Sequence, residues 1–316
     1  MCERAADAGC RPGWHGAVLE PGNRCPLGPA CDLFRRQGGS GRRACSGWRL
    51  PAPGAGRGTR ALRCRQHPRL EIGKVLLIDA GNTRVKWRSL EDSAVAAEGA
   101  GSWEELPDLL QALLRPGDAV CACLPARPEA ARRLQAVVAK RGGRLCLPNR
   151  EPLLERLRPA YDVPERFGLD RLLALRAASE TRPGRPLLVI DAGTAITMDA
   201  LDVSGRHAGG CILPGLSALG EVLAEKAGLP GIAPHALTEE MLDALSDTER
   251  ALASGLRGLI AGGVTHLAGG LEAGLGGRAE WLLSGGDAAT LAVLLGRPTR
   301  VCKNLVLDGL ALECCC

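Results

Sequence analysis

One short pattern occurs twice in the chain, and this repeat restricts the possible folds more than any other feature. Residues 75–78 and 187–190 are uninterrupted apolar runs. Each run is followed directly by Asp-Ala-Gly and then by Asn-Thr or Thr. Apolar runs of this length are typical of strands buried on both faces. The two Asp-Ala-Gly turns lie 112 residues apart. The repeat predicts two related α/β halves, each opening with a buried strand and a tight turn.

Periodicity and capping signals predict further elements around each copy. Ser102 and Glu105 have the spacing of a capping box, which predicts that a helix opens there. Residues 169–179 have apolar side chains at helical spacing, and Gly142-Gly143 ends a helix that begins at Pro128. The other expected strands are 85–90, 119–124, 196–201, 207–212 and 281–283, and the other expected helices are 216–227 and 248–268.

The N-terminal segment differs in composition from the rest of the chain. Residues 1–73 contain 13 Gly, 7 Pro and 13 Arg, with no sustained hydrophobic period. Such a segment buries too little apolar surface to offset its ordering entropy, so we expect a disordered extension. An Arg-rich arm for nucleic acid or a membrane surface is the alternative. The expected halves are residues 74–185 and 186–316.

Charge and hydropathy exclude several classes of protein. The chain has a net charge of +5, but residues 74–316 alone have a net charge of −3, which argues against a general affinity for nucleic acid. No stretch of about 18 apolar residues could span a membrane, and no apolar run follows Met1 as in a secretory signal. We therefore expect a cytoplasmic protein.

The spacing of the cysteines and histidines does not match a metal-binding motif. The 14 cysteines form no C-x-x-C pair outside the terminal run, so zinc is not expected. Cys121 and Cys123 alternate in an apolar run, where cysteine acts as a small hydrophobe. The five histidines have no ligand spacing, and His207 is expected to be solvated at a hairpin turn.

The Asp-Ala-Gly turns have the chemistry of phosphate and metal sites. Glycine after a strand lets the backbone approach a ligand closely, and an aspartate at the strand end can hold a metal ion. A third turn, Ser284-Gly285-Gly286-Asp287, follows the last apolar strand. One such turn alone is more often a structural hairpin. Three of them suit a nucleotide held in a cleft between two halves.

Longer strings around these turns resemble one family. Residues 79–87 resemble the D-x-G-N-[ST]-x-x-K-W opening of type III pantothenate kinases, and residues 191–199 resemble their D-x-G-T-A-x-T-x-D motif. Residues 168–171 resemble the G-x-D-R motif, and residues 209–215 resemble G-G-x-I-x-P-G. The resemblance spans residues 74–312. It implies the actin-like (ribonuclease H-like) fold of the superfamily that contains acetate and sugar kinases, Hsp70 and actin.

The resemblance implies a role for each matching residue. It implies ATP-dependent phosphorylation of pantothenate, with Mg²⁺ accompanying ATP and K⁺ or NH₄⁺ as a second ion. Asp170 would be the proton acceptor, and Asp191 would hold the monovalent cation. The implied ATP-binding residues are Asp79, Ala80, Gly81, Asn82, Thr83, Arg84, Val85, Lys86 and Thr194. The implied pantothenate-binding residues are Tyr161, Gly168, Leu169, Asp170, Arg171 and Lys226.

The residues around Asp170 allow two interpretations. A helix that begins at Leu169 places Asp170 in its first turn, where the helix dipole favours the ionised carboxylate. Phosphoryl transfer through a loose transition state depends mainly on positioning, so a weak base is adequate. The alternative is a helix-capping carboxylate that pairs with Arg171.

Lys226 departs from the family pattern, because the family places a pantothenate-contacting threonine there. A lysine could reach the substrate carboxylate or fill the pocket. Together with the basic N-terminal segment, this departure favours the main alternative function, a non-catalytic regulatory protein on the same fold. A phosphatase or ATPase that uses water as the acceptor is a third possibility, against which the G-x-D-R motif argues.

The resemblance also implies a homodimer. Residues 252–275 are rich in Ala, Gly and Leu nearly all round, with Arg257 and Glu272 as the only formal charges. A helix with so little polar surface is normally buried on most sides, and a second subunit could supply the cover. A central helix of a monomer is the alternative.

Overall fold

The computed structural model describes residues 74–81, 83–124, 128–229, 231, 237 and 247–314. These residues all belong to one compact unit. The expected extension over residues 1–73 and the expected phosphate contact at Asn82 lie outside the described residues. Among the described helices, none has the length and apolarity that a membrane span requires.

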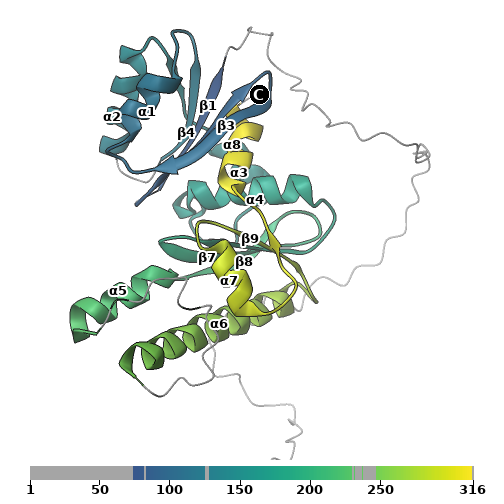
Figure 1. Cartoon of the computed structure of the whole chain (residues 1–316). Helices are drawn as coiled ribbons and strands as arrows, with labels where there is room; N and C mark the ends of the chain where they lie inside the picture. The colour runs from purple at the N-terminus through teal and green to yellow at the C-terminus, as the bar shows by residue number, and fades with distance from the viewer. Residues whose placement is uncertain are drawn as a thin grey trace, which may run out of the picture. The chain divides into compact units, whose positions relative to one another are not determined.

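The first repeat builds a five-stranded mixed sheet (Figure 1). Its strands are β1 (Val75–Ala80), β2 (Val85–Glu91), β3 (Ala94–Gly101), β4 (Ala119–Cys123) and β5 (Arg144–Cys146). Their order in the sheet is β3-β2-β1-β4-β5. β1 pairs antiparallel with β2 and parallel with β4. The apolar run that opens the repeat is therefore the central strand, and the Asp79 turn leads into its hairpin partner.

The second repeat builds a sheet with the same topology. Its strands are β6 (Leu187–Ala192), β7 (Ala195–Leu201), β8 (His207–Pro214), β9 (Glu280–Ser284) and β10 (Arg300–Val301). Their order is β10-β9-β6-β7-β8, with β6 antiparallel to β7 and parallel to β9. Each strand of one sheet has its counterpart in the other. The expected fold class, two related α/β halves with mixed sheets, is confirmed.

Helices cover both sheets. The first half contains α1 (Leu106–Leu113), α2 (Pro128–Lys140), α3 (Glu151–Leu157), the 3₁₀ turn η2 (Pro164–Arg166) and α4 (Leu169–Thr181). The second contains α5 (Leu216–Ala227), α6 (Thr248–Gly274), α7 (Ala288–Leu295) and α8 (Leu305–Cys314). Ser102 and Glu105 make both capping-box hydrogen bonds, although regular helix begins only at Leu106.

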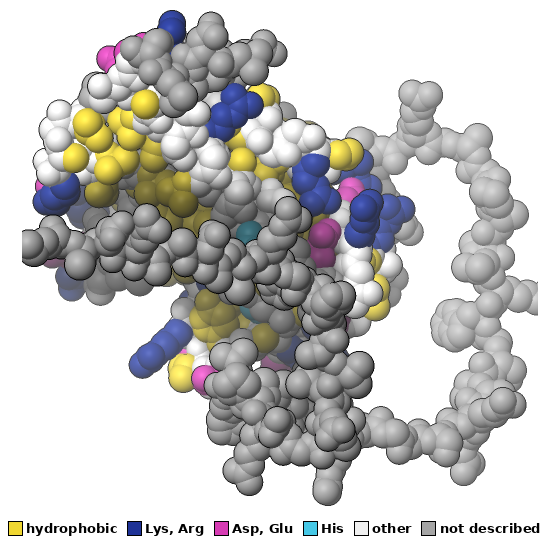
Figure 2. All heavy atoms as spheres, turned by 90° about the horizontal axis from the view of Figure 1, so that it is seen from below, with side chains coloured by type: hydrophobic (Ala, Val, Ile, Leu, Met, Phe, Trp, Pro, Cys, Tyr) yellow, Lys and Arg dark blue, Asp and Glu magenta, His cyan; other side chains and the backbone are white. Residues whose placement is uncertain are grey.

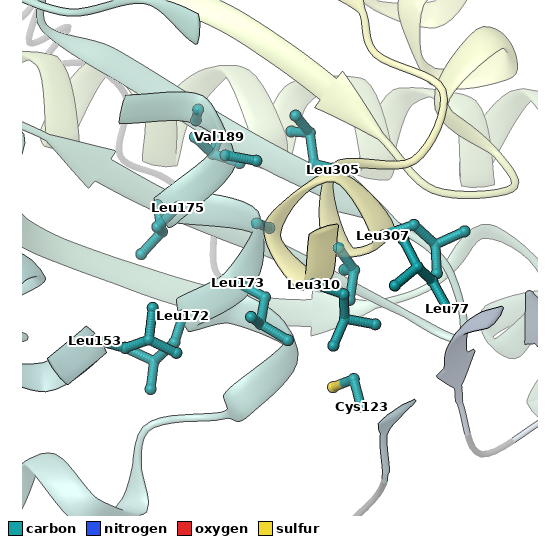
Figure 3. Close-up of a cluster of buried hydrophobic side chains, with 14 of the residues drawn as sticks. Leu77, Cys123, Leu153, Leu172, Leu173, Leu175, Val189, Leu305, Leu307 and Leu310 are labelled. Carbon is teal, nitrogen blue, oxygen red and sulfur yellow. The ribbon is translucent and has the colours of Figure 1, made fainter. Parts of the chain in front are cut away.

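Successive side chains of the two central strands point to opposite faces of their sheets, and they belong to three separate apolar clusters. In β1, Leu76 and Ile78 pack with α1 and α2, whereas Leu77 faces the opposite way. In β6, Leu188 and Ile190 pack with residues of α6 and α7. The remaining faces of both sheets share one central cluster with α3, α4 and α8 (Figure 3). Because side chains alternate in a strand, each apolar run fills two clusters at once.

Helices α4 and α8 form the centre of this cluster and link the halves. α8 comes from the C-terminal end of the chain, yet it contacts β1 and β4 of the first sheet. α4 precedes the second repeat, yet it contacts β6 and β7. The two helices approach so closely that a Cβ at Gly309 would overlap the backbone carbonyl of Leu173. At the surface, Arg88 of β2 pairs with Asp308 of α8 at 2.5 Å.

The prediction that Cys121 and Cys123 lie on one face of a buried strand is confirmed in β4. All five residues of β4 are buried, and Cys121 and Cys123 both belong to the central cluster. Among the described residues, Cys123, Cys146, Cys211, Cys302 and Cys314 are free thiols. The described residues also contain no group of three His, Cys, Asp or Glu side chains that could hold a metal ion.

Candidate active site

The two repeated turns meet, which brings residues 111 positions apart into contact. The Thr83 and Thr194 hydroxyl oxygens lie 3.0 Å from one another. Each turn is closed by its own backbone: the Gly81 amide donates to the Arg84 carbonyl at 2.9 Å, and the Gly193 amide donates to the Ala195 carbonyl at 3.0 Å. Two tight turns with small polar side chains therefore face each other, as a site for successive phosphates requires.

Three aspartates and one lysine share an electrostatic environment beside these turns. Burial raises the pKa of Asp79 to about 7; the Lys86 ammonium acts to lower it, and the charges of Asp191 and Asp170 act to raise it further. Burial likewise raises the pKa of Asp191, against the effect of Lys86. Carboxylates from β1, β6 and the start of α4 thus lie close enough to oppose one another's ionisation. A cation placed among them would relieve this repulsion.

The donor set at Asp191 fits a metal ion. Its Oδ2 atom is buried and has no hydrogen-bond partner among the described residues, whereas the carboxyl group does hydrogen-bond the Ser284 side chain. Carboxylate oxygens suit Mg²⁺ and alkali cations, and Mg²⁺ is usually held by one or two carboxylates together with substrate phosphates.

The third turn packs directly on the second. Gly285 has φ +98°, and a Cβ there would overlap the Ala192 carbonyl, so the position requires glycine. The Asp287 amide donates to the same carbonyl at 3.0 Å. Burial raises the pKa of the Asp287 carboxyl, and the Arg84 guanidinium opposes this shift. The third turn therefore adjoins both repeated turns.

Gly215 ends the G-G-x-I-x-P-G string and shows why the string contains glycine there. Its amide donates to the Thr194 carbonyl at 3.1 Å. A Cβ at this position would overlap the carbonyl of Gly193. The start of α5 is thereby held against the second turn, with no room for a side chain between them.

Asp170 lies in the first turn of α4 and is exposed. Its Oδ1 atom accepts a hydrogen bond from the Arg171 backbone amide at 2.8 Å. A Cβ at Gly168 would overlap this carboxylate oxygen. The carboxylate therefore accepts a backbone bond within the first turn, whereas the N-cap residue, Gly168, makes no side-chain capping bond. The Arg171 side chain is engaged elsewhere, so the expected alternative of an Asp170–Arg171 side-chain pair does not occur.

The Arg171 side chain is buried and bound to Asp199. Its Nε atom donates to Asp199 Oδ2 at 2.9 Å, and its Nη2 atom donates to Asp199 Oδ1 at 2.5 Å. Its Nη1 atom donates to the Tyr161 hydroxyl at 2.8 Å. The G-x-D-R motif, the last aspartate of D-x-G-T-A-x-T-x-D and Tyr161 are therefore one connected group.

The prediction that His207 is solvated is wrong. His207 is buried at the start of β8, where its Nε2 atom lies 2.9 Å from Asp199 Oδ1. Its Nδ1 atom accepts a hydrogen bond from the Ala160 amide at 3.1 Å. Sequence reasoning missed both His207 and Asp199 as functional candidates, although Asp199 closes one of the matched strings.

Lys226 lies apart from this group. It is exposed in the last turn of α5, and its Nζ atom pairs with the exposed Glu225 carboxylate at 2.5 Å. Among the described interactions, none joins Lys226 to Tyr161, Arg171 or Asp170. Its assignment to the pantothenate site stays a prediction.

Comparison with known proteins decides the family. The sequence model of "Type III pantothenate kinase" matches residues 75–269. The chain belongs to this kinase family. A type III pantothenate kinase of Albidiferax ferrireducens is 33% identical over 257 residues, covering 74% of this chain and 95% of the relative. One of Chromobacterium violaceum is 36% identical over 238 residues, covering 74% and 97%.

The type III pantothenate kinase assignment confirms the resemblance drawn from the motifs. Among solved structures, a "conserved putative Baf family transcriptional activator" from Campylobacter jejuni matches with a TM-score of 0.48 and 20% identity. The match covers 74% of this chain and 94% of that one. This likeness is too distant to add to the assignment.

Proposed function

We propose that the protein transfers the γ-phosphoryl group of ATP to the 4′-hydroxyl of pantothenate, the first step of coenzyme A biosynthesis, in the cytoplasm. The observation that carries the proposal is that Asp79, Asp170 and Asp191 lie close together beside the paired turns, where the Lys86 charge acts on Asp79 and Asp191. Membership in the type III pantothenate kinase family supports the choice of acceptor.

The proposed reaction assigns a task to each part of the site. The turns from Asp79 to Lys86 and at Thr194 bind the phosphates. The pantothenate oxygen bonds to the γ-phosphorus as the bond to the β–γ bridging oxygen breaks, and Asp170 accepts the hydroxyl proton. Asp170 is exposed and therefore accessible to an acceptor. Tyr161, Gly168 to Arg171 and Lys226 line the pantothenate site.

The ions belong to the same proposal. Mg²⁺ bound with ATP would offset the charge that develops on the phosphates, and the Asp79 carboxylate would hold it. Asp191, with its unpartnered Oδ2 atom, would hold K⁺ or NH₄⁺.

A coupled assay of ADP release tests the function. The purified full chain is expected to release ADP only when both ATP and pantothenate are present, and to turn over faster in potassium than in sodium buffer. No pantothenate-dependent release in potassium buffer would count against the kinase. Release without pantothenate would instead indicate an ATPase, and binding of neither ligand would favour a regulatory protein.

We also propose that the protein is a homodimer formed through α6. Only one face of this helix is buried, through Ala253, Leu256, Ile260, Val264 and Ala268. On the opposite face Leu259 is 60% exposed, and Cβ atoms at Gly258 and Gly262 would meet nothing within 4 Å. Figure 2 shows the molecule from below relative to the view in Figure 1, and hydrophobic side chains lie at the surface on this side. Small residues there would let a second helix approach closely.

Light scattering measures the oligomeric state. We expect a dimer mass of about twice 33.0 kDa at micromolar concentration, and a Leu259→Lys variant is expected to dissociate it. A fully active wild-type monomer would contradict the proposal.

A further inference from the structure

A closed circuit of hydrogen bonds includes the chain segment that precedes Asp170. It starts at the Ala160 backbone amide, passes through His207, Asp199 and Arg171, and ends at the Tyr161 hydroxyl. Ala160 and Tyr161 are adjacent in sequence, so the circuit returns to the residue next to its start. It holds the Ala160 backbone amide and the Tyr161 side chain in place.

The donors and acceptors of the circuit determine the form of His207. Its Nδ1 atom accepts from the Ala160 amide, so the ring proton lies on Nε2 and is donated to Asp199 Oδ1. Asp199 thereby receives one bond from His207 and two from Arg171. His207 is the member of the circuit that joins the Ala160 backbone to this buried ion pair.

Aromatic packing fills the interior of the circuit. Phe167 is fully buried; its ring lies 4.2 Å from the Arg171 guanidinium carbon and 4.8 Å from the His207 ring, measured to ring centroids. The Tyr161 ring meets Phe167 edge-on at 4.9 Å. Phe167 directly precedes Gly168, the N-cap of the helix that holds Asp170. Displacement of the circuit would therefore be passed to the start of α4.

The surrounding backbone is built to admit the circuit. A Cβ at Gly210 would overlap Asp199 Oδ1 and lie 3.0 Å from Arg171 Nη2, so the second glycine of the G-G pair makes room for the ion pair. On the other side, Arg158 adopts φ +46°, a left-handed conformation that is uncommon for a residue with a side chain. The His207 bond to Ala160 follows two residues later and holds the chain after this turn.

We propose that His207 is a positioning residue for the acceptor site: through Ala160, and through Asp199 and Arg171, it holds Tyr161 in the place where it meets pantothenate. This inference rests on the proposed function. His207 touches neither ATP nor the reacting atoms, so its effect falls on acceptor binding. Binding energy lost by misplacing a contact residue appears in the KM for that substrate.

Two substitutions open the circuit at different points. His207→Gln keeps a donor for Asp199 and removes the acceptor for Ala160, whereas His207→Asn keeps an acceptor near Ala160 and removes the donor. In the full-chain assay, each is expected to raise the KM for pantothenate about tenfold, with the KM for ATP within about twofold. Arg206→Gln, at the neighbouring exposed position, is the control and is expected to change neither value.

A double-mutant cycle tests whether His207 acts through Tyr161. Tyr161→Phe is expected to raise the KM for pantothenate, and adding His207→Gln to it is expected to raise that KM further by much less than tenfold. Unchanged KM values in both His207 variants, or effects that multiply fully in the double variant, would overturn the inference. A loss of active protein with unchanged KM values would indicate a purely structural role and would overturn it too.

Tyr161 also provides a readout that needs no catalysis, because it is the only tyrosine in the chain. Full-length protein labelled with 3-fluorotyrosine is expected to give one ¹⁹F resonance, shifted or broadened by His207→Asn and unaffected by Arg206→Gln. Pantothenate is expected to shift the wild-type resonance. No shift with pantothenate and no turnover would refute the proposed function; identical resonances in wild type and His207→Asn would refute the circuit's role independently.

Discussion

Asp170→Asn is expected to lower kcat by about 100-fold or more and to leave the KM for ATP within about twofold. Asparagine keeps the size of the side chain and removes its charge and its capacity to accept a proton. The phosphates are proposed to bind at the β1 and β6 turns and not to the Asp170 carboxylate, so nucleotide affinity is expected to persist. Steady-state kinetics with pantothenate and ATP varied separately measure both quantities.

The matched control is Asp108→Asn, since Asp108 is also an exposed aspartate in the first turn of a helix. It is expected to leave kcat unchanged, apart from any small loss of α1 stability. If Asp170→Asn stayed within threefold of the wild type, the carboxylate would be a helix cap and the proton acceptor would have to be found elsewhere.

Asp79→Asn is expected to stabilise the nucleotide-free protein at pH 8 while abolishing kinase activity. Burial raises the pKa of Asp79 from 3.8 to about 7, so between these values the folded protein holds a proton that the unfolded chain has released. The free energy of unfolding therefore falls as the pH rises through this window. Asparagine does not titrate, so the variant avoids this loss.

The expected gain is on the order of 2–4 kcal/mol at pH 8 and close to zero at about pH 3, where the wild-type carboxyl is largely protonated in both states. Denaturant unfolding at the two pH values measures it. Asp92→Asn, at an exposed turn between β2 and β3, is the control and is expected to show no pH-dependent difference. An Asp79→Asn variant less stable than wild type at pH 8 would show that the folded protein favours the Asp79 carboxylate, against the raised pKa.

The two central strands and the paired turns could be predicted from the sequence because they depend on local patterns. Each central strand is a continuous apolar run, and each turn carries its own Asp and Gly, so no distant residue was needed to find them. The end of α6 was harder to place. The sequence pattern predicts a helix that ends near residue 268, but the helix continues to Gly274. There Glu272 accepts bonds from Ala279 and Trp281, contacts that no local pattern reveals.

The buried circuit could not be predicted for the same reason. Asp199 lies 28 residues from Arg171, and His207 lies 47 residues from Ala160. Whether His207 is buried also depends on where the turn between β7 and β8 ends. Asp202 and Arg206 close the β7–β8 hairpin by a backbone bond, so His207 becomes the first residue of β8 and is directed inward. A turn one residue longer would have left it in solvent.

The path of α8 has a consequence for how the protein is made. The inner face of the first sheet, including Leu77, is covered by α8, a helix that lies more than 200 residues later in the sequence. During synthesis this face therefore stays uncovered until α8 has been translated. The proposed boundary near residue 185 marks two repeats in sequence but not two pieces that could fold separately. A ribosome that stops early leaves a first half without its last covering helix, and such a product is a natural substrate for chaperones and proteases.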